Sequence, residues 1–379
     1  MYTLALSNPL HMRIAIFLFT LLFSISSLQA QIQVVDSLSN TRIAGANVYT
    51  DSGLLIGSSD LNGVIHLDSL QAVKASTITL NHISYQNLDI PYAEFLKAKV
   101  IRMQARSVAL EEVTVMDREK YDYVVLKGYF RNYETFNNRP RYLYDGIVSY
   151  YIPINKNKGK SKMELHQYRL FSNAEANQEL KDTQGSLMYF KPSIGNIQSK
   201  SLLEAIEGVK GAKLKNSGNR TVIENEGIAM GYSQVGADGN TQVFYNVFPP
   251  GKKVHVSFFR IKFDVYKSTR SESYQGNNYT NPSIMDLISR VSTVSASIKR
   301  QKEHGYMPRD YSTEFYVMER SFLTKAEYKA LKPNDKRWQF LEEKSKYTEE
   351  FWKDLDRYGI PPVIKSVASK IGNELKLAN

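Results

Sequence analysis

The stretch that decides the fold is Gly57-Ser58-Ser59-Asp60-Leu61-Asn62-Gly63-Val64-Ile65-His66-Leu67. Asp60 and Asn62 can hydrogen-bond their own backbone and Gly63 can adopt a positive φ, so the middle of the stretch predicts a tight turn. The residues after it predict an alternating strand, and residues 54–57 before it also favour a strand. We therefore expect a hairpin around this turn.

Short β-favouring runs continue on both sides of this turn. Turn residues separate them about every eight to twelve positions, which is typical of a β-sandwich and not of alternating strands and helices. The predicted strands are residues 32–35, 46–49, 54–57, 64–67, 76–80, 86–90 and 100–103.

Four sequence blocks, residues 43–48, 57–67, 78–85 and 110–115, resemble the carboxypeptidase-regulatory-like (transthyretin-like) domain of Bacteroidetes cell-envelope proteins. The resemblance covers residues 31–118 and implies a seven-stranded β-sandwich that serves as an appendage. Ser84 stands where the family usually has Gly, and Val64 or Ile65 where it usually has Phe. Because appendage domains occur on proteins of many activities, the resemblance implies location and architecture more than chemistry.

The remainder, residues 119–379, predicts an α+β domain with a large antiparallel sheet and C-terminal helices, so the whole chain is expected to be mainly β. Tyr121, Val124, Val125, Gly128 and Tyr129 fall at helical spacing, which predicts a short linking helix. Residues 283–302 fit a helix or a strand equally well. The predicted long strands are residues 143–153, 163–172, 185–190, 221–235, 242–248, 254–266 and 312–318.

Residues 254–266 carry apolar side chains at alternate positions until Phe259 breaks the register, which indicates a bulge or a strand that passes under a cover. Such an apolar face is usually packed against something. In the tail, a capping Thr324 starts a predicted helix over 324–331, and Thr348 starts a second over 348–357. The Pro361-Pro362 pair is expected to open a last helix that ends near residue 375.

Residues 1–30 predict a secretory signal peptide. Residues 11–13 form a short basic region, residues 14–23 an apolar region and residues 24–30 a region of mostly small and polar residues. The apolar run is shorter than the ~20 residues that span a bilayer, so we expect cleavage, after Ala30, over anchoring; a buried core helix is the alternative. Met12 is a second candidate for the true start.

The chain contains no cysteine and has a formal net charge of +11. The absence of cysteine excludes disulfides, thiolate catalysis and a lipidated cysteine, so the protein is not expected to be a lipoprotein. Export argues against nucleic acid as a partner, which leaves contact with an anionic membrane surface or a solvated basic surface. The densest basic run consists of Lys156, Lys158, Lys160 and Lys162. Its first interpretation is a hairpin loop, and its second is a binding patch.

No catalytic constellation is found. None of the six histidines is followed by Glu at the third position, as zinc carboxypeptidases require, and no Gly-x-Ser-x-Gly or phosphate-binding loop is present. We therefore assign no catalytic, cofactor-binding or metal-binding residue and expect no cofactor. The remaining candidates are a Lys302-Glu303-His304 cluster, calcium oxygens on Asp60 and Asn62, and a carbohydrate platform at Tyr150-Tyr151 or Phe258-Phe259. A solvated loop, a hydrogen-bonded turn and core packing explain these residues more simply.

The sequence thus predicts an exported binding or structural module of the periplasm or outer membrane, not an enzyme, whose partner is an envelope protein, a lipid or a glycan. One alternative is an envelope hydrolase with a site assembled from His166, His255, His304 and nearby carboxylates. Another is an accessory subunit of an outer-membrane complex. If the large sheet holds a ligand, residues 140–320 should enclose a cavity.

Overall fold

The computed structural model describes residues 31–66, 73–106, 120–155, 160–185, 191–249, 252–258, 261–300, 304–337 and 339–379. The predicted signal peptide, the block at 110–115 and all but the first residue of the predicted strand at 185–190 lie outside these residues. The described chain is mainly β, as predicted, and contains one very large sheet. Within it, no helix combines the length and apolar character needed to cross a membrane.

The N-terminal unit is a β-sandwich of a three-stranded and a four-stranded sheet, with orders β4-β1-β7 and β3-β2-β5-β6. All seven strands occur where the sequence predicts them. Strand β1 pairs in parallel with β7, and the other pairs are antiparallel. Ile32, Val34, Ile78 and Leu80 are fully buried between the sheets. The elements are β1 (Gln31–Asp36), β2 (Asn47–Thr50), β3 (Leu55–Ser58), β4 (Val64–His66), β5 (Thr77–Asn81), β6 (Leu88–Pro91), α2 (Tyr92–Phe95) and β7 (Val100–Met103).

The tight turn at residues 60–63 is confirmed, whereas the hairpin around it is wrong. Asp60 Oδ1 accepts the amide protons of Asn62 at 2.8 Å and Val64 at 2.9 Å, and Gly63 has a φ of +71°. However, β3 pairs with β2 and β4 pairs with β1, so the turn carries the chain from one sheet to the other. Ile65 is thereby buried in the core from the opposite side.

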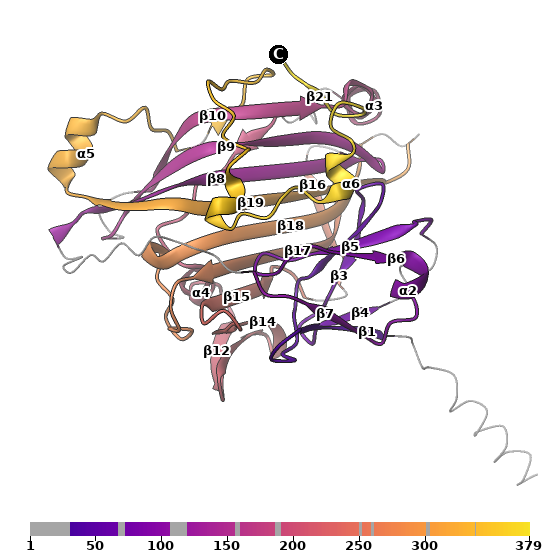
Figure 1. The fold of residues 1–379 in the computed structure, drawn as a ribbon, viewed down its shortest axis with the longest axis horizontal. Helices are drawn as coiled ribbons and strands as arrows, with labels where there is room; N and C mark the ends of the chain where they lie inside the picture. The colour runs from indigo at the N-terminus through magenta and orange to yellow at the C-terminus, as the bar shows by residue number, and fades with distance from the viewer. Residues whose placement is uncertain are drawn as a thin grey trace, which may run out of the picture.

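The C-terminal part is built on a 12-stranded sheet whose strand pairs are all antiparallel (Figure 1). The order is β12-β13-β14-β15-β17-β18-β19-β8-β9-β10-β21, and β16 also pairs with β17. The bounds are β8 (Tyr123–Phe136), β9 (Arg139–Pro153), β10 (Lys162–Ser172), β12 (Ala212–Ser217), β13 (Arg220–Asn225), β14 (Ile228–Val235), β15 (Thr241–Asn246), β16 (Val254–Phe258), β17 (Ile261–Tyr274), β18 (Leu287–Lys299), β19 (Met307–Leu323) and β21 (Lys376–Leu377).

The predicted linking helix is wrong, because residues 123–136 form the central strand β8. Val124 and Leu126 are buried on one face of the sheet, while Tyr129 and Tyr133 are buried on the other. A strand that is covered on both faces has no clean alternation of apolar and polar residues. Its apolar residues can therefore fall at helical spacing by coincidence.

Two other segments differ from their predicted form, and the structure decides a third. The run at 254–266 is not one strand but the hairpin β16–β17, and the run at 221–235 contains β13 and β14, which are joined by a turn at Glu226 and Gly227 with φ of 50° and 80°. Residues 283–302, left open between helix and strand, form η5 (Ile284–Asp286) and β18. The expected strand at 312–318 is confirmed within the much longer β19.

The tail is less helical than predicted. Helix α5 (Lys325–Leu331) is confirmed, and Thr324 and Glu327 form its capping box. The predicted helix at 348–357 is wrong, since only the 3-10 turn η6 (Leu355–Tyr358) forms there, and the last helix is reduced to α6 (Lys365–Ala368). The reason is tertiary, because Lys346 exchanges two backbone hydrogen bonds with Tyr168 of β10 and the chain extends along the sheet. Elements the sequence did not predict are α2, β12 and β21, together with α3 (Ala174–Gln184), α4 (Leu202–Glu207), β11 (Ser193–Ile194) and β20 (Gln339–Phe340).

One face of the large sheet, here called the sandwich face, is covered by the N-terminal sandwich and by the C-terminal strap, residues 347–375. Figure 1 shows the indigo sandwich and the yellow strap on the same side of the sheet. Ile83 of the sandwich packs against Tyr129 and Tyr316 of the sheet. Asn47 Nδ2 donates a hydrogen bond to Thr293 Oγ1 at 3.3 Å.

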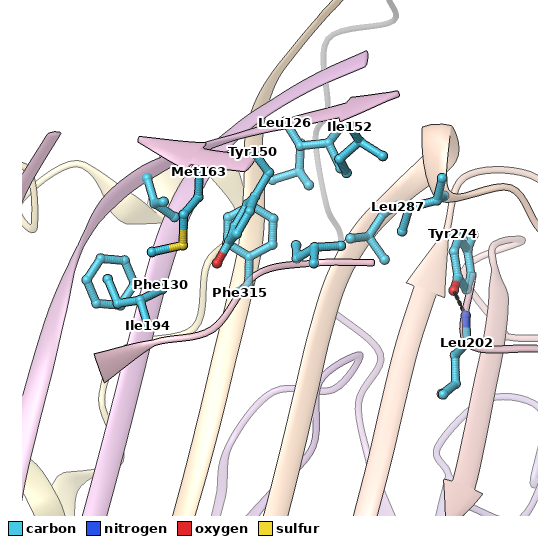
Figure 2. Packing of buried hydrophobic residues seen from close by; sticks show 14 of the residues in the cluster. Leu126, Phe130, Tyr150, Ile152, Met163, Ile194, Leu202, Tyr274, Leu287 and Phe315 are labelled. Carbon is cyan, nitrogen blue, oxygen red and sulfur yellow. Dashed lines mark hydrogen bonds between the residues drawn. The ribbon is translucent and has the colours of Figure 1, made fainter. Parts of the chain in front are cut away.

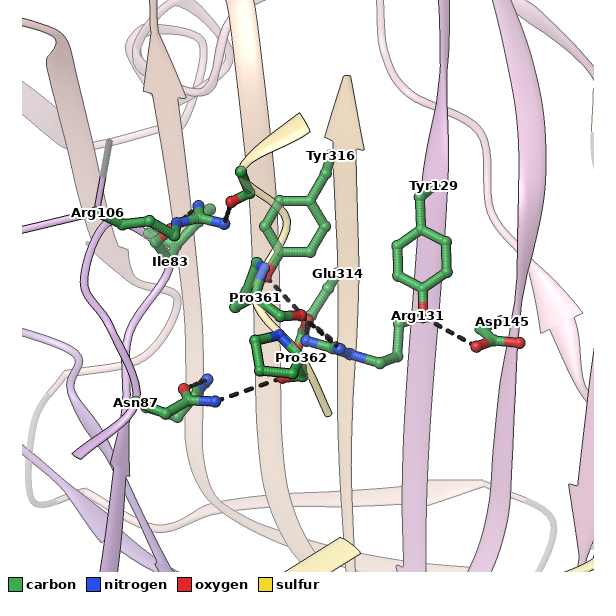
Figure 3. Close-up of polar contacts among 12 residues, drawn as sticks. Ile83, Asn87, Arg106, Tyr129, Arg131, Asp145, Glu314, Tyr316, Pro361 and Pro362 are labelled. Atoms are coloured by element: carbon green, nitrogen blue, oxygen red, sulfur yellow. Dashed lines mark hydrogen bonds and ion pairs between the residues drawn. The ribbon is translucent and has the colours of Figure 1, made fainter. Parts of the chain in front are cut away.

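Three side chains clamp the strap between the sandwich and the sheet, as Figure 3 shows. Arg131 of β8 donates to the carbonyl of Pro361 at 3.0 Å, and Asn87 of the sandwich donates to the carbonyl of Pro362 at 3.4 Å. Arg106 donates to the carbonyls of both Ile83 and Gly359. These three strap carbonyl groups are not paired in a helix, and the arginine and asparagine side chains satisfy them instead.

The opposite face, here called the open face, carries the largest apolar core. Phe130, Tyr150, Met163 and Phe315 pack together there beneath Ile194, as Figure 2 shows. Further along the sheet, helix α4 covers the same face, and the Leu202 amide donates to Tyr274 Oη at 2.8 Å. Between this core and the hairpin formed by β16 and β17, the open face contains a hollow.

Candidate functional site

The hollow on the open face is a cavity of about 600 Å³. Its floor is formed by β17, β18, β19, β8 and β9, and one wall is the β16–β17 hairpin. Cross-strand partners lie on the same face of a sheet, so the register places its side chains in rows. The lining residues are Asn132, Tyr133, Glu134, Tyr144, Lys191, Pro192, Ser193, Gly195, Val256, Phe263, Val265, Val294, Ala296, Ile298, Arg309, Tyr311, Ser312 and Thr313.

The rows at one end of the cavity are apolar. Phe263 lies opposite both Val256 and Ile298, and Val265 lies opposite Ala296. Val256 remains 45% exposed although it faces these apolar neighbours. The apolar face predicted at residues 254–266 is therefore not fully packed, and it forms a wall of the cavity.

A second cavity of about 210 Å³ adjoins the first and shares four lining residues with it, Asn132, Ser193, Gly195 and Thr313. Here the row that crosses the floor is polar. Arg270 lies opposite Ser292, Ser292 opposite Thr313, and Thr313 opposite Asn132. Arg290, from the next row, also lines this cavity. The two cavities together form a channel that is apolar at one end and cationic at the other.

Residues 193–197 cover part of this channel. Tyr144 Oη donates to the carbonyl of Ser193 at 3.2 Å, and Tyr150 Oη donates to the carbonyl of Gly195 at 3.1 Å. Strand β11 within this cover pairs with β20. Two floor tyrosines therefore hold the cover at a fixed height above the sheet.

The charged groups of the channel differ in their pairing. Burial raises the pKa of Glu134, but the guanidinium groups of Arg309 and Arg141 outweigh it and hold that pKa below its ordinary value. Arg290 Nε lies 3.3 Å from Glu272 Oε1. Arg270 is half-buried, and no carboxylate of the described chain lies within ion-pair distance of it. Among the described residues, Arg270 is thus a cation without a counter-ion, and it lies at the polar end of the channel.

The structure does not bring the three candidate histidines together. His166 Nε2 lies 2.7 Å from Ser149 Oγ on β9, and His255 Nδ1 lies 2.6 Å from Asp264 Oδ1 on β17. Strands β10 and β16 are six strand spacings apart along the sheet, roughly 29 Å. His304 lies after β18, and none of the three lines either cavity of the channel.

The other candidates are placed as follows. The Asp60 carboxylate is used by its own turn, and within the described residues no three His, Asp or Glu side chains form a group that could hold a metal ion. Lys302 and Glu303 lie outside the described residues, as do Phe259 and the side chain of Phe258.

The aromatic pair on β9 belongs to the protein interior. Tyr150 and Tyr151 are 3% and 4% exposed, which confirms core packing over a carbohydrate platform. Of the basic run, Lys156 and Lys158 are outside the described residues, while Lys162 Nζ pairs with Asp335 Oδ1 at 2.8 Å.

Sequence reasoning missed most of the channel. Its one usable signal was the alternation in residues 254–266, which marks one wall. Val294, Ala296 and Ile298 alternate with Ser295 and Ser297 in the same way, but residues 283–302 as a whole fit a helix as well as a strand. The floor arginines carry no local signal, because only the register brings them into one row.

No protein-family model matches this chain, and no curated protein is similar to it in sequence. The channel and its chemistry therefore stand on the geometry of this structure alone.

Proposed function

We propose that the protein is a non-catalytic binding module of the bacterial cell envelope, which holds an apolar or extended ligand in the channel on the open face of its large sheet. The observation that carries this proposal is the cavity of about 600 Å³. Its size lies within the range of ligand sites, about 300–1,000 Å³, and such sites are usually lined by apolar side chains with a few placed polar groups.

The exposure of apolar residues at the cavity supports a ligand that covers them. Val256 and Tyr311 both line it and are 45% and 39% exposed. Soluble proteins rarely leave contiguous apolar surface without a use for it. A bound apolar group would remove this surface from water, at about 25 cal/mol per Å².

The location and the role of the sandwich are part of the same proposal. The predicted signal peptide supports export to the periplasm or the outer membrane, and the resemblance to the carboxypeptidase-regulatory-like domain supports an appendage that docks on another envelope protein. Fractionation of cells that express the full chain tests the location. Recovery of the protein in the cytosol with residues 1–30 intact would contradict it.

The binding function is tested with the hydrophobic dye N-phenyl-1-naphthylamine on the purified chain. Val265→Trp fills the channel, while Tyr266→Trp adds the same ring on the neighbouring residue, which points to the opposite face of the strand. We expect dye enhancement from the unchanged protein and from Tyr266→Trp, and an affinity at least about tenfold weaker for Val265→Trp. Circular dichroism checks that both variants fold. Equal dye affinity in all three proteins would remove the channel as the site.

A further inference from the structure

We infer that the ligand of the channel is an amphiphile with one aliphatic chain and one anionic headgroup, bound with its headgroup at Arg270 and its chain along the apolar rows. This inference rests on the proposed binding function and adds the chemical class and the orientation of the ligand. It follows from three features of the channel, which are its apolar end, the cation that has no carboxylate partner within the described part of the chain, and its length.

The apolar end fits an aliphatic chain. Val265 and Ala296 are cross-strand partners, and so are Phe263 and Ile298, so four apolar side chains form two adjacent rows of the floor. Val294 continues the same face toward the polar end. A chain laid along β18 would contact apolar side chains at every second residue of that strand.

The polar end fits one anion. Arg270 is half-buried without a carboxylate partner among the described residues, and a guanidinium that loses water without a counter-ion is costly. Its cross-strand neighbours Ser292 and Tyr245 bring hydroxyl groups to the same row. A carboxylate or phosphate headgroup pairs with a guanidinium through two parallel hydrogen bonds.

The remaining charges oppose a cationic ligand. Glu134, the carboxylate that faces the larger cavity, is already engaged by Arg141 and Arg309. The Glu314 carboxylate binds Arg131 on the sandwich face, although Glu314 also borders the smaller cavity. Both of these carboxylates are thus already paired, and Lys191 adds a positive charge to the lining of the larger cavity.

The length of the channel requires an extended ligand. The row of Ile298 and the row of Ser292 are six residues apart on β18, which corresponds to roughly 20 Å. A small free anion would reach the cation but leave the apolar rows exposed. A hydrocarbon without a headgroup would cover those rows but leave Arg270 uncompensated.

The inference is tested by displacement of N-phenyl-1-naphthylamine with three single-chain probes of equal chain length, each below its critical micelle concentration. The probes are dodecanoate, the neutral 1-lauroylglycerol and cationic dodecyltrimethylammonium. We expect dodecanoate to displace the dye at least about tenfold more effectively than the neutral probe, and the cationic probe to be weakest.

Arg270→Gln tests the headgroup contact, and Lys262→Gln removes one positive charge from an exposed position on the same strand as its control. The preference for dodecanoate over 1-lauroylglycerol should vanish in Arg270→Gln and persist in Lys262→Gln, while the neutral probe binds all three proteins alike. This difference separates a headgroup contact from general charge, because both variants change the net charge equally.

Two outcomes would overturn the inference. If neutral and anionic probes displace the dye equally from the unchanged protein, or if only the cationic probe does, the ligand class is wrong although the channel still binds. If dodecanoate keeps its preference in Arg270→Gln, the headgroup lies elsewhere. Failure of the dye itself to bind would instead contradict the proposed function, so the two failures are distinguishable.

Discussion

Arg131 and Glu314 lie directly opposite each other on β8 and β19, and Arg131 Nη2 is 2.5 Å from Glu314 Oε2. Their side chains are 5% and 10% exposed, so the pair lies inside the interface where the sandwich, the sheet and the strap meet. Arg131 also holds the strap through the carbonyl of Pro361, and Tyr316 Oη donates to Glu314 at 2.9 Å. Arg131 therefore ties the sheet to the strap at a place that Tyr49 and Asn81 of the sandwich also border.

Glu314→Gln is expected to lower the free energy of unfolding by about 3–5 kcal/mol, because it leaves the Arg131 charge buried and unpaired. Glu319→Gln is the matched control, since Glu319 pairs with Lys127 across the same two strands but is 56% exposed. An exposed pair contributes about 0–1 kcal/mol. Urea denaturation measures both. Equal losses for the two variants would contradict the buried role of Arg131 and Glu314.

Arg169→Lys is expected to loosen the strap. Arg169 binds both oxygens of Asp145, at 3.0 and 2.6 Å, and its guanidinium lies 3.9 Å from the ring centre of Trp352. Lysine keeps the charge but loses the paired geometry and the stacking, at a cost of about 1.5–3 kcal/mol. Trypsin should cleave after Lys353 or Arg357 faster than in the unchanged protein.

Arg139→Lys serves as the control for this substitution, because Arg139 is 52% exposed and pairs with the exposed Glu175. Its strap should remain as resistant to trypsin as that of the unchanged protein. If the two lysine variants are cleaved at the same rate, the contact between Arg169 and Trp352 does not hold the strap.

His82 should make the protein sensitive to mild acid. Burial lowers the pKa of His82 to about 4, and the Arg106 charge adds to this effect. Between pH 6.5 and 4 the unfolded chain therefore binds a proton that the folded chain does not, and the free energy of unfolding falls by about 3 kcal/mol as the pH drops through this range. His82→Asn should reduce that slope in urea titrations. An unchanged slope would show that His82 is not the responsible group.

Asp310 should act in the opposite direction. Burial raises its pKa to about 6, against hydrogen bonds from Ser295 and Thr135. The raised pKa of Asp310 therefore stabilises the folded state fully when the pH is below the ordinary carboxyl pKa of 3.8. This stabilisation is lost as the pH rises through 6. Asp310→Asn should raise the free energy of unfolding at pH 7.5 by up to about 3 kcal/mol, with less gain at pH 4. A variant that is less stable than the unchanged protein at pH 7.5 contradicts this.

Gly128→Ala should destabilise the sheet at its centre. A Cβ at Gly128 would lie 2.1 Å from the backbone oxygen of Tyr316 on β19, so β8 and β19 would have to separate locally. We expect a loss of at least about 1–3 kcal/mol, the usual cost of overpacking. Gly195→Ala is the control, because a Cβ there meets no atom within 4 Å. Thermal melts that shift equally in both variants would contradict the close approach.

The sequence predicted best where structure depends on neighbouring residues. The seven sandwich strands, the Asp60 turn and the capping Thr324 all rest on local hydrogen bonds or on a period of two, and the structure has all of them. Local patterns failed where another part of the chain supplies the partner. Tyr129 and Val124 lie on opposite buried faces of β8, so their spacing gave a false helical signal.

The channel also combines features that neighbouring residues set with features that distant parts of the chain set. Sequence alone predicted that the chain is mainly β and that residues 254–266 carry an apolar face. Only the tertiary structure decided that Val265 and Arg270 border one channel, because the register of β17 against β18 sets which side chains share a face and a row. That register depends on pairing between segments far apart in the chain, which no local pattern encodes.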